Sequence, residues 1–148
     1  MIISMKKRIR PGIAAVIFVK NNGKKKYLLL KRKLYWTGWE WIKGGKKKGE
    51  SELACLQREI MEETGKNPDE YYFKKTRFIL KFMYERPFVQ DFQLWNGARN
   101  RVYLIEFLNS KIKLDNDEHS GFKWVPKQDA LKMITHEDQR KIFKKIAK

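Results

Sequence analysis

Cysteine, acidic residues and long apolar runs are all scarce in this chain of 148 residues. The single cysteine, Cys55, excludes an internal disulfide and is typical of a reducing compartment, so we expect a cytoplasmic location and a packing role for Cys55. The apolar run at residues 13–19 is too short to cross a bilayer and lacks a cleavage site of small residues. We therefore expect neither a membrane span nor a signal peptide.

The shortage of acidic residues leaves a large positive charge. Lysine and arginine number 34 against 17 aspartates and glutamates, which gives a formal net charge of +17. A charge of this size favours polyanionic partners, such as nucleic acid or nucleotides with long phosphate chains. An anionic membrane is a weaker alternative because the basic residues are spread along the chain. No segment indicates an obligate protein partner.

The length favours one domain over residues 1–148, with a basic lead-in at residues 1–11. Apolar and alternating segments predict strands, and two late amphipathic segments predict helices. The expected strands lie at 13–20, 27–31, 36–42, 71–85 (one long or two short), 92–95, 101–108 and 122–125, and the helices at 129–133 and 137–147. We expect a hairpin turn at Asn96-Gly97. This mixture predicts an α+β fold, arranged as an α/β/α sandwich.

Five of the 17 acidic residues lie close together at residues 50–63. A further helix is predicted between Ser51, a plausible N-cap, and Gly65, which suits the left-handed residue after the last turn. Three glutamates, Glu59, Glu62 and Glu63, fall within a single turn of it. Carboxylates this close repel one another, and a divalent cation is the simplest reason to gather them.

Helical periodicity divides this segment into two sides. We expect one side to face the core, with Leu53, Leu56, Ile60, Met61 and Thr64. The other side, with Glu52, Glu59, Glu62 and Glu63, would present oxygens to a cleft. A solvated acidic face is the alternative, but such faces usually alternate with basic residues, and only Arg58 lies among these acids.

The spacing of the segment resembles the signature of the Nudix hydrolases. Gly44 is followed after five residues by Glu50, after seven more by Arg58-Glu59-Ile60, and then by Glu62-Glu63 and Gly65. The resemblance implies a mixed β-sheet packed between helices. It also implies cleavage of pyrophosphate bonds in nucleoside diphosphates linked to another group, with Mg²⁺ or Mn²⁺. Lys66 departs from the hydrophobic residue that is usual after the last glycine.

The resemblance implies a set of metal ligands. Glu62 and Glu63 would bind the metal, and Glu59 would be either a ligand or the general base that accepts a proton from water. The main-chain carbonyl of Lys43, or of its neighbour Gly44, would complete the coordination. Ions held in this way would neutralise phosphate oxygens and activate water.

Other residues would support or extend this set. The family pairs Glu50 with Arg58 so that the arginine steers the catalytic carboxylates. Residues 118–125 resemble the Glu-x-x-Gly-x-x-Trp-Val region of bacterial RNA pyrophosphohydrolases and plant dinucleoside tetraphosphate hydrolases. That resemblance implies that Glu118 is a further metal-binding or catalytic carboxylate. Glu52 lies outside the signature, and a metal role for it stays an alternative.

Candidate substrate contacts lie outside the helix. The basic candidates for the phosphate chain are Lys43, Lys46, Lys47, Lys48, Arg99 and Arg101, and the aromatic candidates for stacking a base are Tyr35, Trp36, Phe88 and Trp95. A solvated surface charge is the alternative for each cation. The two histidines, His119 and His136, are interpreted as structural or exposed.

The resemblance points first to asymmetrical cleavage of diadenosine tetraphosphate. Residues 38–45, Gly-Trp-Glu-Trp-Ile-Lys-Gly-Gly, resemble a stretch of those hydrolases, with Ile42 in place of the usual proline. Removal of pyrophosphate or a cap-like nucleotide from an RNA 5′ end is the second possibility, because phosphate contacts supply most sequence-independent affinity. A non-catalytic nucleic-acid-binding module on this scaffold is a remote alternative, which the complete set of carboxylates disfavours.

Overall fold

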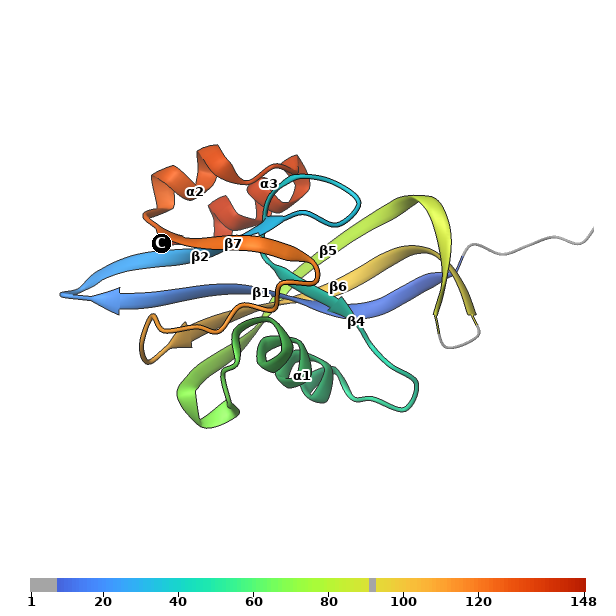
Figure 1. The fold of residues 1–148 in the computed structure, drawn as a ribbon, viewed down its shortest axis with the longest axis horizontal. Coiled ribbons are helices and arrows are strands. Elements are labelled where there is room, and N and C mark those ends of the chain that lie inside the picture. Colours follow the sequence, from blue (N-terminus) through green and yellow to red (C-terminus); the bar gives the residue numbers. More distant parts are fainter. Residues whose placement is uncertain (1–7, 91–92) are drawn as a thin grey trace, which may run out of the picture.

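The structure, a computed structural model, describes residues 8–90 and 93–148. Within them a mixed sheet of seven strands lies between helices (Figure 1). The strands are β1 (Ile9–Asn21), β2 (Lys24–Arg32), β3 (Gly38–Glu40), β4 (Ile42–Gly45), β5 (Tyr71–Gln90), β6 (Gln93–Phe107) and β7 (His119–Val125). The helices are α1 (Glu52–Thr64), α2 (Lys127–Met133) and α3 (Glu137–Ile146), with a short 3-10 turn η1 (Pro68–Glu70). The prediction of an α+β fold with the sheet between helices is confirmed.

Strand β1 lies at the centre of the sheet. The strand order is β3-β2-β1-β6-β5, with β4 also paired to β1 and β7 to β2. The pairing of β1 with β6 is parallel, from Ile9 opposite Gly97 to Val19 opposite Phe107, whereas the other named pairings are antiparallel. A strand with both faces covered is continuously apolar, which explains the run at residues 13–19.

The alternation of side chains along β1 divides the core into two layers. One layer faces α1 and contains Ile13 and Ile17, packed with Leu56 and Ile60 of that helix. The other layer faces α2 and α3 on the opposite side of the sheet (Figure 1). None of the helices in the described residues is long and apolar enough to cross a membrane.

Helix α1 has the predicted ends but not the predicted sides. The Ser51 side chain accepts a hydrogen bond from the Ala54 N–H, and Gly65 is left-handed with φ 75°. Leu53 and Met61, expected in the core, are each 39% exposed. Glu59 and Glu63 are buried instead, at 9% and 6% exposed, together with Cys55, Leu56, Ile60 and Thr64. The buried side therefore includes carboxylates, because they face polar and charged groups of neighbouring strands and loops.

The predicted hairpin at Asn96-Gly97 is wrong, because β6 continues through both residues to Phe107. Asn96 instead exchanges hydrogen bonds with the Arg8 backbone, at 2.9 and 2.8 Å. A Cβ on Gly97 would lie 2.6 Å from the Phe82 carbonyl oxygen, so the glycine permits close approach of β5 rather than a turn. Phe92, the first residue of one predicted strand, lies outside the described residues.

Three other boundaries differ from the sequence prediction. Strand β1 begins at Ile9, so the expected lead-in is wrong for residues 9–11, which pair with residues 97–99; residues 1–7 lie outside the described residues. The single strand expected at 36–42 is divided into β3 and β4. The segment at 71–85 is part of one long strand, β5, with irregular pairing at two places.

Candidate active site

A cleft of about 440 Å³ opens where α1, β4 and the loop before β7 meet. Its carboxylates come from Glu59, Glu62, Glu63, Asp115, Asp117 and Glu118, and its cations from Arg10, Lys43, Lys47 and Arg58. The fold thus brings Glu118 to the same opening as the glutamates of α1. A cleft that combines grouped carboxylates with cations can hold both a metal ion and phosphate groups.

The backbone of β4 lies against the carboxylate of Glu59. A Cβ placed on Gly44 would lie 2.2 Å from the Glu59 carboxyl carbon and from one of its oxygens. The Gly44 carbonyl is also 3.8 Å from the Cys55 sulfur, which donates a weak hydrogen bond to it. Only a residue without a side chain fits between the strand and this carboxylate.

Replacing Gly44 with Ala should therefore displace Glu59 and lower kcat by at least about tenfold, because misplacement of a reacting group by about an ångström is costly. Gly121→Ala is the matched control, since a Cβ there meets nothing within 4 Å. Steady-state kinetics and thermal unfolding of both variants are the measurements. Equal kcat values for the two variants would contradict the contact argued for Gly44.

Arg58 ties Glu59 to the loop before α1. Its Nε and Nη2 donate to the two oxygens of Glu50, at 2.7 and 3.0 Å, and its Nη1 donates to Glu59 at 2.8 Å. Nη2 also donates to the Gly45 carbonyl at 3.0 Å. The hydrogen bonds from Arg58 lower the pKa of Glu50 to about 2. The Glu50–Arg58 pair thus has the geometry to orient Glu59.

Glu59 has an unusual protonation equilibrium. Burial and the nearby Glu62 and Glu63 together raise its pKa to about 7, against the lowering effect of Arg58. A divalent cation beside Glu59 would favour the ionised form of its carboxyl group. Carboxylate and carbonyl oxygens are the donors that hard cations prefer, so these residues and the Gly44 carbonyl fit such an ion.

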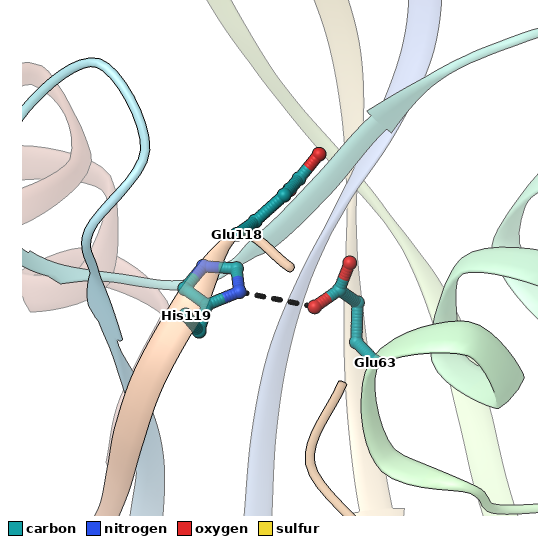
Figure 2. Close-up of side chains that lie close together, drawn as sticks. All are labelled: Glu63, Glu118 and His119. Carbon is teal, nitrogen blue, oxygen red and sulfur yellow. Dashed lines mark hydrogen bonds and ion pairs between the residues drawn. The ribbon is translucent and has the colours of Figure 1, made fainter. Parts of the chain in front are cut away.

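His119 lies between two buried carboxylates. Its Nδ1 is 3.0 Å from Glu63 and its Nε2 is 2.8 Å from Glu40, and the first of these contacts is drawn in Figure 2. Burial alone would lower the pKa of His119, but the hydrogen bonds to Glu40 and Glu63 raise it to about 9. His119, Glu63 and Glu118 lie close enough to hold a metal. The raised pKa favours protonation of both ring nitrogens, and in that form the imidazole is a buried cation rather than a ligand.

Glu40 was not recognised as a site residue from the sequence. Its side chain is 1% exposed and contacts Arg32 and Lys43, each at 3.2 Å, in addition to His119. Burial would raise the pKa of Glu40, but the hydrogen bond to His119 and these cations lower it to about 2. The signal in the sequence is an acid between two tryptophans, Trp39 and Trp41, in a short apolar segment.

Lys43 and Glu118 are linked to the same charge network. The Lys43 Nζ atom lies 3.2 Å from Glu40 and near the rings of Trp36 and Phe82, at 5.8 and 4.8 Å. Glu118 is half-buried and shares Arg32 with Glu40, at 3.2 Å. Burial raises the pKa of Glu118, against the effect of Arg32. Both side chains line the cleft and can meet a ligand there.

Arg10 is a second site residue that sequence reasoning missed, because it fell in the expected lead-in. It is 7% exposed and lines the cleft, with Nη1 donating to Gln90 at 2.7 Å and Nη2 to the Lys46 carbonyl at 3.3 Å. Its Nε has no hydrogen-bond partner, and no carboxylate of the described residues forms an ion pair with it. A buried guanidinium without a counter-charge favours an anionic ligand.

Of the other predicted substrate contacts, Lys47 lines the cleft and the rest are not in its lining. Lys46 lines a neighbouring hollow, while Arg99 is exposed on β6 and Arg101 donates to the Thr76 carbonyl at 3.3 Å. Tyr35 is 90% exposed, and the Trp36 ring packs 4.4 Å from that of His136. The structure therefore gathers the metal-site candidates but separates most of the substrate candidates.

Glu52 points away from the cleft. Its carboxylate accepts a hydrogen bond of 2.5 Å from the Tyr103 hydroxyl and lies 3.2 Å from Lys75. These contacts fix the start of α1 to the sheet, and Glu52 is not among the residues that line the cleft.

Residues 10–146 match the family model described as the NUDIX domain. The chain belongs to the Nudix family. This Nudix hydrolase is 27% identical over 146 residues to an RNA pyrophosphohydrolase of Nitratiruptor sp., with 95% of this chain and 92% of the relative covered. It is 24% identical over 145 residues to an RNA pyrophosphohydrolase of Helicobacter pylori strain P12, with the same coverage.

Two solved structures share the fold of this Nudix hydrolase. A binary complex of an Ap4A hydrolase from C. elegans has a TM-score of 0.71 at 21% identity, covering 94% of this chain and 96% of that one. The dihydroneopterin triphosphate pyrophosphohydrolase of E. coli has a TM-score of 0.75 at 17% identity, covering 95% and 97%. The protein is thus a pyrophosphohydrolase of the Nudix family, with a cluster of carboxylates that could bind a divalent metal.

Proposed function

We propose that the protein removes pyrophosphate from the triphosphorylated 5′ end of RNA with the help of Mg²⁺ or Mn²⁺. The observation that carries this proposal is the cleft that places the buried cation of Arg10 with the carboxylates of α1. The relatives named RNA pyrophosphohydrolase, aligned over nearly their whole length, and the net charge of +17 support an RNA substrate.

In this proposal Glu62 and Glu63, with a backbone carbonyl of β4, would hold the metal, which would supply charge neutralisation at the phosphate oxygens and a more acidic water. Glu118 is a further ligand or base from the loop before β7. Arg10 and Lys43 bind oxygens of the phosphate chain through their positive charges.

Glu59 is the proposed proton acceptor. Its carboxylate can accept a proton from water, and Arg58 holds it in position with a hydrogen bond of 2.8 Å. A water oxygen attacks the phosphorus nearest the ribose, its proton passes to Glu59, and the bond to the bridging oxygen breaks. The products are pyrophosphate and an RNA with a 5′-monophosphate.

Asymmetrical cleavage of diadenosine tetraphosphate is the second candidate. It is favoured by the loop before β3, where the Trp36 ring lies 5.8 Å from the Lys43 ammonium at the cleft. An aromatic side chain beside a phosphate-binding cation offers a stacking position for an adenine.

Turnover of triphosphorylated RNA, diadenosine tetraphosphate and nucleoside triphosphates, with products identified by mass, tests the proposal. We expect pyrophosphate from RNA, with kcat/KM at least about tenfold above that for the dinucleotide, because an RNA chain adds phosphate contacts. Faster production of ATP and AMP from the dinucleotide would favour the second candidate. Absence of metal-dependent turnover of every substrate would contradict both.

A further inference from the structure

Beside the cleft lies a second hollow, which we propose holds the nucleotides that follow the 5′ end of a single-stranded RNA. This proposal rests on the proposed function and adds to it the course of the RNA chain outside the catalytic cleft. The surface is defined by the hollow and by Arg99 and Lys81 next to it, and is called here the basic track.

The hollow has a volume of about 480 Å³ and shares the lining residue Lys47 with the cleft. Lys46, Lys47 and Lys48 of the loop after β4 line one side, and Trp95 of β6 is also in the lining. A chain that leaves the cleft over Lys47 would therefore enter a space lined by three lysines and a half-buried indole ring.

The basic track extends from the hollow across three adjacent strands. Arg99 of β6 is in register with Pro11 of β1 on one side and with Lys81 of β5 on the other, so the three side chains share one face of the sheet. Pro11 lines the hollow, which places Arg99 directly beside it. Trp95 lies four residues before Arg99 on the same strand, a span of about 13 Å. A ligand that contacts both ends of this span is longer than one nucleotide.

The charges on the basic track have no ion-pair partner in the part of the chain that the structure describes. Arg99 and Lys81 are both exposed and lie directly opposite each other, and like charges in that position destabilise a sheet. Neither these two residues nor Lys46, Lys47 and Lys48 form an ion pair with an acid of the described residues. The one acid of the hollow, Glu50, is bound by Arg58 through two hydrogen bonds.

Single-stranded RNA matches this surface better than the alternatives do. Grooves for single strands combine cations that follow the backbone with aromatic side chains that stack bases, and the basic track offers both. A stiff duplex would gain the charge contacts but not the stacking. A short nucleotide would fill the cleft and leave Arg99 and Lys81 without a ligand. The basic track thus gives a role to Arg99, which lies outside the cleft.

Two experiments test the basic track. The first compares kcat/KM for triphosphorylated RNA of two nucleotides and of about 12 nucleotides, a length within the range that such grooves cover. The variant Arg99→Gln/Lys81→Gln removes two positive charges from the track. Its matched control, Lys24→Gln/Lys26→Gln, removes two exposed charges at the β1–β2 turn, which lies at the other end of the sheet from β4 and α1 (Figure 1).

We expect the parent protein to have a higher kcat/KM for the longer RNA than for the RNA of two nucleotides. The track variant should reduce this ratio about tenfold, and the control should leave it unchanged. For the longer RNA, the slope of log(kcat/KM) against log(salt) should become shallower by about 1.4, at roughly 0.7 for each lost phosphate contact. Trp95→Leu should reduce the length preference without changing the slope, because stacking carries no counterion release.

The second experiment measures the Kd of a labelled 12-mer with a 5′-hydroxyl, which does not depend on pyrophosphate chemistry. We expect the track variant to bind about tenfold more weakly than the control. Equal binding by the two variants, or equal kcat/KM for the two RNA lengths, overturns the basic track. If the track variant binds the 12-mer more weakly than the control, but the parent protein releases no pyrophosphate from RNA, the proposed function is refuted and the track remains supported. Equal affinity of the parent protein for duplex and single strands would also overturn the track.

Discussion

The substitution Glu59→Gln should lower kcat at saturating Mg²⁺ by at least about 100-fold, while the chain stays folded. Glutamine keeps the shape of the side chain and can still accept the hydrogen bond that Arg58 donates at 2.8 Å. What disappears is the negative charge that a cation would neutralise and the site that takes up a proton. Since the fold gains little from this charge, the loss should be confined to chemistry.

Metal-dependent turnover with a fixed substrate, measured over a range of Mg²⁺ concentrations, is the relevant experiment. Glu52→Gln is the matched control, because it makes the same change about two helix turns before Glu59, at a carboxylate held by Tyr103 and Lys75. We expect the control to retain kcat within about threefold, as for surface changes away from a site. A near-normal kcat of Glu59→Gln at saturating Mg²⁺ would contradict the role proposed for Glu59.

The same variant should be more stable than the parent protein in the absence of metal. Burial raises the pKa of Glu59 from 4.5 to about 7, so its ionisation disfavours the folded state. That cost is absent below pH 4.5, grows between pH 4.5 and about 7, and is complete above this window. The difference in melting temperature should therefore increase over this range.

Local patterns in the sequence predicted the parts of the site that lie on one element. The glutamates of α1, its cap at Ser51 and its end at Gly65 follow from spacing and turn chemistry over a short stretch. The sides of the helix were less predictable. Hydrophobic periodicity assumes that carboxylates face water, whereas Glu63 is buried against His119.

Contacts between distant segments could not be found in the same way. Glu40 and His119 are 79 residues apart, and Arg10 and Gln90 are 80 apart, so no local spacing links them. Arg10 became a cleft residue because β1 begins earlier than its apolar run, in parallel register with β6. The Asn96-Gly97 pair likewise misled the prediction of a turn. Its glycine lies within β6 and permits the close approach of β5.

The largest effect on stability is expected for His119→Ala. The change leaves the carboxylates of Glu40 and Glu63 buried without the cation that lies 2.8 and 3.0 Å from them. Removing one partner of a buried ion pair typically costs about 3–5 kcal/mol. For a chain of this length, such a loss lowers the melting temperature by roughly 10 °C. His136→Ala, at an exposed site, should change the free energy of unfolding by less than about 1 kcal/mol.

The pH dependence of unfolding separates the charge of His119 from its packing. Since hydrogen bonds to Glu40 and Glu63 raise the pKa of His119 from 6.5 to about 9, its charge stabilises the fold fully below pH 6.5, and this contribution disappears as the pH rises through 9. The lowered pKa of Glu40, about 2 against 4.5, removes its contribution as the pH falls through that range. The gap in unfolding free energy between the parent protein and His119→Ala should therefore be widest between pH 4.5 and 6.5 and narrow above pH 9. A gap that does not change with pH would mean that His119 acts only through its volume.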